Sequence, residues 1–148
     1  MVEAAFVIPI LFLFIFALID IGLWVFETSQ ASSAARDGAR AGIVLKLNGT
    51  TGAAKTANET TIRNAVVARL ADNRITDPVK DIKITCFTSA TSDTPVACDA
   101  VASGSGRLRV TVTWKRPFLT FVGGIFGGAD RTVTGKATMV MVGKPTAG

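Results

Sequence analysis

The sequence predicts an α+β protein, in which a long N-terminal helix carries a small head of one further helix and an antiparallel β-sheet. Two patterns predict this fold class. An apolar run, Ala4–Phe26, is followed without a break by a proline-free segment of helix formers, Glu27–Leu47. Polar and apolar residues then alternate in three later segments. We expect residues 1–47 to form the helix, with an apolar half (1–27) and an amphipathic half (28–47), and residues 48–148 to form the head.

The apolar run is interrupted only by Pro9, Asp20 and Gly22. At about 1.5 Å per residue it is roughly 34 Å long, which is enough to cross a lipid bilayer. We expect one continuous helix from about residue 3 to 46, in which Pro9 causes a kink or lies near the first turns. The turn-forming segment Asn48–Gly52 should end it.

The head begins with a predicted second helix over Glu59–Ala71, because apolar residues recur there at every fourth position. Asn58 is the expected N-cap. Three segments that alternate polar and apolar residues predict strands over residues 81–86, 107–115 and 132–141. Their apolar side chains should lie on one face of a sheet, covered by the second half of the long helix and by the second helix.

Charge is distributed unevenly along the chain. Residues 1–27 have a net charge of −3 and residues 28–148 a net charge of +8. The basic residues of the head either keep it soluble or contact an anionic surface or nucleic acid; the candidates for such contact are Arg107, Arg109, Lys115 and Arg116. No basic residue precedes the apolar run, which read literally would leave the head in the cytoplasm. We favour instead a basic leader upstream of Met1, and therefore an extracytoplasmic head.

The two cysteines, Cys86 and Cys98, flank a segment with the composition of a loop. A disulfide between them would suit an oxidising compartment and contribute roughly 3 kcal/mol in the chain-entropy model. Two buried thiols are the alternative. Two cysteines in a chain without histidine cannot supply the four ligands of a zinc site, so we expect neither a metal nor another cofactor.

Two acidic residues in the apolar half are candidate assembly residues. Glu3 either lies among lipid headgroups or pairs with a basic or amino group of a neighbouring subunit. Asp20 lies inside the apolar run, where an ionised carboxylate costs up to about 3 kcal/mol at mid-membrane. Asp20 is therefore near the membrane surface, protonated, or in need of a partner.

Small residues recur at four-residue spacing in the amphipathic half, and such rows let helices approach closely. They either pack on the protein's own sheet or provide a second contact with the helix of another subunit. The residues are Ala34, Gly38 and Gly42 in one row, and Ala31, Ala35 and Ala39 in the other.

An apolar segment, Phe118–Phe126, lies between two predicted strands, where a polar turn would be usual. It either folds over the edge of the core or forms an interface through Phe118, Phe121, Ile125 and Phe126. Catalytic patterns are missing: the chain has no histidine, no nucleophile elbow and no phosphate-binding loop. We therefore expect a protein that is not an enzyme.

The chain resembles the TadE-like family of tight-adherence pilus systems. The resemblance is carried by Val2–Leu11, Ile19–Leu23 and Ala34–Ala41, and more weakly by Val110–Trp114, Phe118–Phe126 and Val133–Met141. It implies a type IV pilin-like fold and a precursor whose basic leader is cut by a prepilin peptidase. It also implies storage in the cytoplasmic membrane and assembly with copies of itself or other pilins into a cell-surface fibre. Glu3 and Asp20 match the acidic positions of the family.

These observations predict a structural pilin-like subunit, serving as the repeated fibre subunit or as a minor pseudopilin. The assembly residues would be Glu3, Pro9, Asp20, Ala34, Gly38 and Gly42. The alternative is a single-span anchored protein with a basic head that binds an anionic surface or DNA and does not polymerise. Phosphate binding by such a head would weaken steeply with salt.

Overall fold

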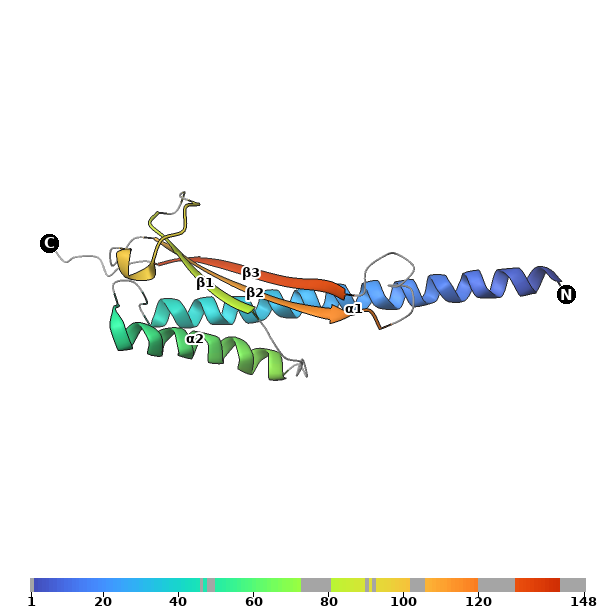
Figure 1. Ribbon diagram of the computed structural model, residues 1–148, viewed down its shortest axis with the longest axis horizontal. Coiled ribbons are helices and arrows are strands. Elements are labelled where there is room, and N and C mark those ends of the chain that lie inside the picture. Colours follow the sequence, from blue (N-terminus) through green and yellow to red (C-terminus); the bar gives the residue numbers. More distant parts are fainter. Residues whose placement is uncertain are drawn as a thin grey trace.

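The computed structural model describes residues 2–45, 47, 50–72, 81–89, 91, 93–101, 106–119 and 130–141. Helix α1 (Val2–Val44) runs along the whole molecule, and its first half projects beyond the head (Figure 1). The head contains helix α2 (Gly52–Asp72), strands β1 (Asp81–Phe87), β2 (Arg107–Pro117) and β3 (Asp130–Val140), and the short 3₁₀-helix η1 (Cys98–Ala100). The predicted α+β, pilin-like layout is confirmed.

The sheet is antiparallel, with the strand order β1-β2-β3. Its register places Ile84 opposite Val110, and Val112 opposite Gly135. The alternation that predicted the strands is also their burial pattern, because every second residue of β2 from Leu108 to Trp114 is buried. One face of the sheet therefore forms the core, as expected.

The second half of α1 lies between the sheet and α2, in contact with β2, β3 and α2 (Figure 1). A glycine on β3 permits the closest approach. A Cβ atom at Gly135 would collide with the backbone of Ala31 and lie 2.5 Å from the amide nitrogen of Ser32. Only a residue without a side chain lets the α1 backbone rest directly on the strand.

The predicted start of the second helix is wrong. The helix begins at Gly52 rather than after Asn58, and Gly52 has a φ of +59°. Asn58 lies inside α2 and is not an N-cap: its side-chain nitrogen donates to the carbonyl oxygen of Leu45 at 3.2 Å. This bond ties α2 to the end of α1, and the Ala-rich turns before Asn58 extend the helix backwards.

The predicted disulfide between Cys86 and Cys98 is confirmed. Between the two cysteines the chain returns to β1, where the amide nitrogen of Val96 donates to the carbonyl oxygen of Cys86 at 2.9 Å. The bond therefore fastens the end of β1 to η1, at the end of the head that lies away from the N-terminus of α1 (Figure 1).

Candidate membrane and assembly site

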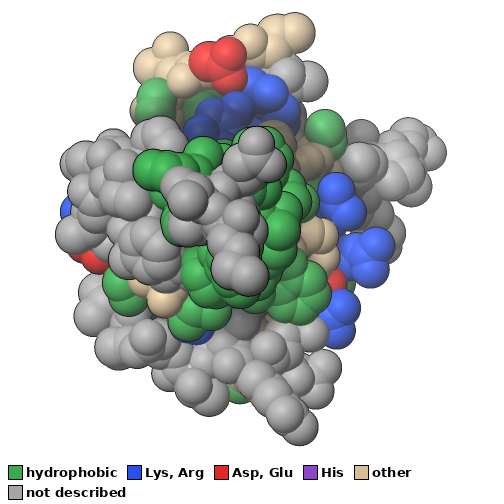
Figure 2. Space-filling view, turned by 90° about the vertical axis from the view of Figure 1, so that its right-hand side faces the viewer, with side chains coloured by type: hydrophobic (Ala, Val, Ile, Leu, Met, Phe, Trp, Pro, Cys, Tyr) green, Lys and Arg blue, Asp and Glu red, His purple; other side chains and the backbone are tan. Residues whose placement is uncertain are grey.

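The first half of α1 exposes large apolar side chains around its circumference. Phe6 is 72% exposed and Phe26 is still 53% exposed. Among the described residues, α1 is the one helix that is long and apolar enough to cross a membrane. Figure 2, which faces the N-terminal end of α1, shows hydrophobic side chains near the centre, with Lys and Arg side chains above and to the right of them. A helix that exposes apolar side chains over most of its circumference has the surface of a membrane span.

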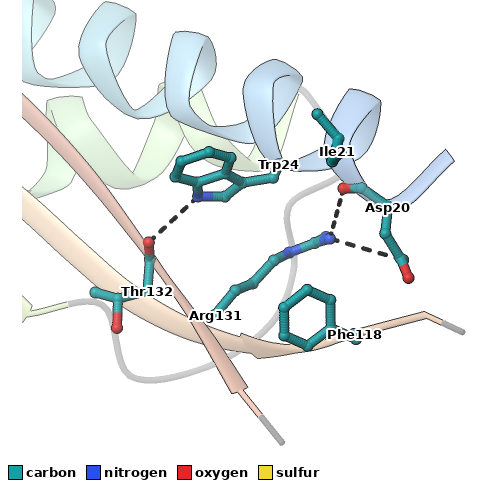
Figure 3. A pocket seen from close by; sticks show the side chains of 6 residues that line it. All are labelled: Asp20, Ile21, Trp24, Phe118, Arg131 and Thr132. Carbon is teal, nitrogen blue, oxygen red and sulfur yellow. Dashed lines mark hydrogen bonds and ion pairs between the residues drawn. The ribbon is translucent and has the colours of Figure 1, made fainter. Parts of the chain in front are cut away.

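One face of this half is less exposed, and on it the side chain of Asp20 is buried by residues of the head. Its Oδ1 atom accepts a hydrogen bond from the amide nitrogen of Leu119 at 3.1 Å. Arg131 Nη1 donates to the backbone oxygen of Asp20 at 3.1 Å and lies 3.9 Å from Oδ1 (Figure 3). The partner that Asp20 was expected to need is therefore an arginine of the same chain, not of another subunit.

Glu27 lies two turns further along the same face of α1 and is also buried. Its Oε1 atom accepts a hydrogen bond from Arg131 Nη2 at 3.3 Å and lies 3.8 Å from Arg116 Nε. Arg116 and Arg131 face each other across β2 and β3. Glu27 therefore compensates two arginines that would otherwise repel each other. We call these four residues, Asp20, Glu27, Arg116 and Arg131, the ionic clamp.

The strands position the ionic clamp through their alternation. Arg116 lies two residues after the buried Trp114, and Arg131 lies two residues before the buried Val133. Both arginines therefore share the face of the sheet that packs on α1. Sequence reasoning missed Arg131 and the role of Glu27. The sequence held one signal for this site: β2 and β3 each carry an arginine in register with their apolar residues, and the apolar half of the helix carries two acids seven residues apart.

A pocket of about 240 Å³ lies beside the ionic clamp, between α1 and the ends of β2 and β3. Trp24 Nε1 donates to the backbone oxygen of Thr132 at 3.4 Å, and the guanidinium carbon of Arg131 lies 5.9 Å from the centre of the Phe118 ring (Figure 3). The lining is almost wholly apolar where it is exposed, and comprises Asp20, Ile21, Trp24, Phe118, Arg131 and Thr132.

The small residues of the amphipathic half lie inside the subunit. Gly38 adjoins Val66 of α2 and Val110 of β2, and Gly42 adjoins Leu108 and Ile62. All six residues of the two rows are buried by the protein's own head. The structure therefore shows the first of the two expected arrangements, in which α2 and the sheet together cover both rows. A contact of Ala34, Gly38 and Gly42 with a neighbouring helix stays a prediction.

Three further candidates are placed only in part. Glu3 lies in the first turn of α1, and Pro9 lies inside the same helix with its ring exposed. In the apolar segment after β2, Phe118 is half-buried and Leu119 is 73% exposed. The remaining expected interface residues, Phe121, Ile125 and Phe126, lie outside the described residues.

The four basic residues proposed for anion or nucleic-acid contact do not form one patch. Arg107 and Arg109 both bind Asp93, at 3.2 and 3.4 Å, and both lie over the ring of Phe87. Arg116 is held by Glu27 on the opposite face of the sheet, while Lys115 is exposed. Three of the four candidates are therefore engaged within the chain, and their contact with an anionic surface or nucleic acid stays a prediction.

The long exposed helix and the α+β head thus define a pilin-like layout. Residues 1–40 match the family model described as TadE-like protein, which confirms the predicted resemblance to that family over the first part of the chain. No curated protein and no solved structure matches the chain. The matched region covers the apolar half of α1, both acids of the ionic clamp and the small-residue rows except Gly42.

Proposed function

We propose that this protein is a structural pilin-like subunit, which is stored in the cytoplasmic membrane through the first half of α1 and assembled through it into a tight-adherence pilus. The TadE-like match indicates a pilus-related subunit. The observation that carries the proposal is the apolar helix beyond the head, which has the length of a membrane span and leaves most of its large apolar side chains exposed. Such a surface can be covered by lipid before assembly and by sister helices afterwards.

Transfer of the helix from lipid to a bundle of helices gains little from the hydrophobic effect, because both surroundings are apolar. Polar contacts must therefore supply direction and register. Asp20 and Glu27 are engaged in the ionic clamp, which leaves Glu3 as the acid of the apolar half to pair with a neighbouring subunit. We assign this pairing role to Glu3, whether the protein is the repeated fibre subunit or a minor pseudopilin.

The expected partners are copies of this chain or other pilins, a prepilin peptidase and the machinery of pilus assembly. No catalytic step is assigned to the protein. The expected location is the cytoplasmic membrane before assembly and the cell surface afterwards.

The test replaces Glu3 with alanine and compares membranes with material sheared from the cell surface. Glu3→Ala should remain in the membrane fraction and be lost from the sheared fibres, because insertion depends on the apolar residues and assembly on the carboxylate. Glu59→Ala, which removes an acid from α2, is the matched control and should enter fibres normally.

Normal fibres containing Glu3→Ala would contradict the role of this residue. A wild-type protein that is monomeric in detergent and never occurs in sheared material would instead support the anchored binding protein that does not polymerise.

A further inference from the structure

The position of Asp20 makes the apolar span too short unless the acid itself enters the membrane. The part of the apolar run before it, Ala4–Ile19, carries no charged residue and is roughly 24 Å long at about 1.5 Å per residue. A bilayer has a hydrocarbon core of about 30 Å. The run that continues to Phe26 is roughly 34 Å long and would cross it. A helix that spans the bilayer therefore carries Asp20 into the apolar region near one surface.

The ionic clamp lowers the cost of placing the Asp20 carboxylate in the apolar region of the bilayer. Asp20 is only 2% exposed, and its charge is met by the guanidinium of Arg131 and the amide of Leu119. An uncompensated carboxylate would be costly there. Leu119 follows the end of β2 and Arg131 lies at the start of β3, so lipid that surrounds α1 at the level of Asp20 also meets this end of the two strands.

The surface around the ionic clamp is apolar and exposed. The side chain of Leu119 is 73% exposed, although its backbone amide is bonded to Asp20. Phe26, six residues after Asp20 and therefore about 9 Å further along the axis of α1, is also exposed. Trp24 is half exposed, and its ring nitrogen is bonded to Thr132. Tryptophan, which has an apolar ring and one polar atom, is enriched at membrane–water interfaces. Because its amide is bonded to Asp20, Leu119 lies beside the half of α1 assigned to the membrane, which favours lipid as the occupant of this surface.

We propose that the end of the β2–β3 hairpin, at Phe118 and Leu119, lies in the lipid bilayer beside α1 and forms a second membrane contact of the head. Acyl chains cover Leu119 and the mouth of the apolar pocket beside Trp24. Lys115, four residues before Leu119 and exposed, lies at the level of the lipid phosphates. This inference rests on the proposed storage of the subunit in a membrane. It adds that the head is held against the membrane until assembly withdraws the hairpin.

The test measures depth in lipid along β2. Single cysteines replace Lys115, Pro117 or Leu119, which are all exposed and follow one another at two-residue spacing, about 7 Å apart along a strand. Each is labelled with a nitroxide in the full chain, reconstituted in vesicles of phosphatidylcholine and phosphatidylglycerol. Collisions with oxygen report lipid, and collisions with a water-soluble nickel complex report water. Leu11→Cys on α1 is the lipid control, and Lys136→Cys on β3 is the water control.

The label at position 119 should lose nickel collisions and gain oxygen collisions relative to position 136, approaching the values at position 11. Position 117 should be intermediate, and position 115 should resemble 136. If position 119 resembles position 136 while position 11 is in lipid, the inference is wrong and membrane storage stands. If position 11 is also in water, membrane storage itself fails. Circular dichroism and an intact Cys86–Cys98 bond establish that each variant is folded.

Discussion

The two halves of α1 form one continuous helix, but they differ in the size of their side chains and in what covers them. The first half exposes Phe, Ile and Leu side chains over most of its circumference. The second half presents Ala and Gly to the head, and its rows of small residues are buried. Small side chains let the sheet and α2 approach the backbone, whereas large ones prevent it and leave a surface for lipid or other helices. The ionic clamp lies at the boundary between these two surfaces.

Loss of Arg131 should have the largest effect on this arrangement. Arg131→Met leaves the carboxylates of Asp20 and Glu27 buried without their main partner, which should lower the free energy of unfolding of the head by about 3–5 kcal/mol. Thermal unfolding in detergent, followed by near-ultraviolet circular dichroism, measures this loss.

The matched control for this substitution adds Asp20→Asn to Arg131→Met. The double variant should be more stable than the sum of the single losses predicts, because the introduced side-chain amide carries no charge and its oxygen can still accept the bond from the Leu119 amide. Strictly additive losses would show that Asp20 and Arg131 do not interact, and the boundary between the two halves would then need another explanation.

Contact between the second half of α1 and β3 can be broken at Gly135. Gly135→Ala places a methyl group against the backbone of Ala31, which cannot move aside as a flexible side chain could. We expect a loss of about 1–3 kcal/mol in the free energy of unfolding, measured in the same way. Gly22→Ala is the control in the first half, where nothing lies within 4 Å of the added Cβ atom. Equal losses for both variants would contradict the difference in packing.

The smallest effect is expected at the ion pair between Asp37 on α1 and Arg69 on α2, whose nearest atoms are 3.4 Å apart. Both side chains are more than 40% exposed, so water screens the attraction. Asp37→Ala should change the free energy of unfolding by less than about 0.5 kcal/mol. A loss above about 1 kcal/mol would show that surface charge, rather than the fit of small residues, holds the second half of α1 in the head.

The sequence alone was sufficient to predict the elements in which apolar residues recur at a regular spacing. The long helix, three strands and disulfide followed from apolar spacing and from the loop between the cysteines. The start of α2 did not, because the bond from Asn58 to Leu45 joins two helices whose relative position no local pattern contains. Local preferences therefore placed the start of the second helix at Asn58, because asparagine is a favoured N-cap residue.

The ionic clamp could not be predicted from one chain without its topology. Asp20 and Arg131 lie 111 positions apart, and only the register of β2 and β3 brings Arg131 to the helix. The same applies to the small-residue rows: Ala34 and Gly38 permit close packing on either side, and docking at Gly135 determines that the protein's own sheet is the partner. The spacing of small residues predicts that a helix face is packed closely, but it does not predict which element packs against that face.

The central claim is that the exposed half of α1 contacts sister helices in the fibre, and site-specific photo-crosslinking tests it most directly. A photoreactive phenylalanine analogue replaces Ile10, which is 67% exposed on the first half of α1. In sheared fibres we predict covalent adducts between position 10 and the first half of α1 in a neighbouring subunit, whereas in membranes the same position should yield lipid adducts. Fibres that contain the labelled protein but form no such helix-to-helix adduct would contradict the account.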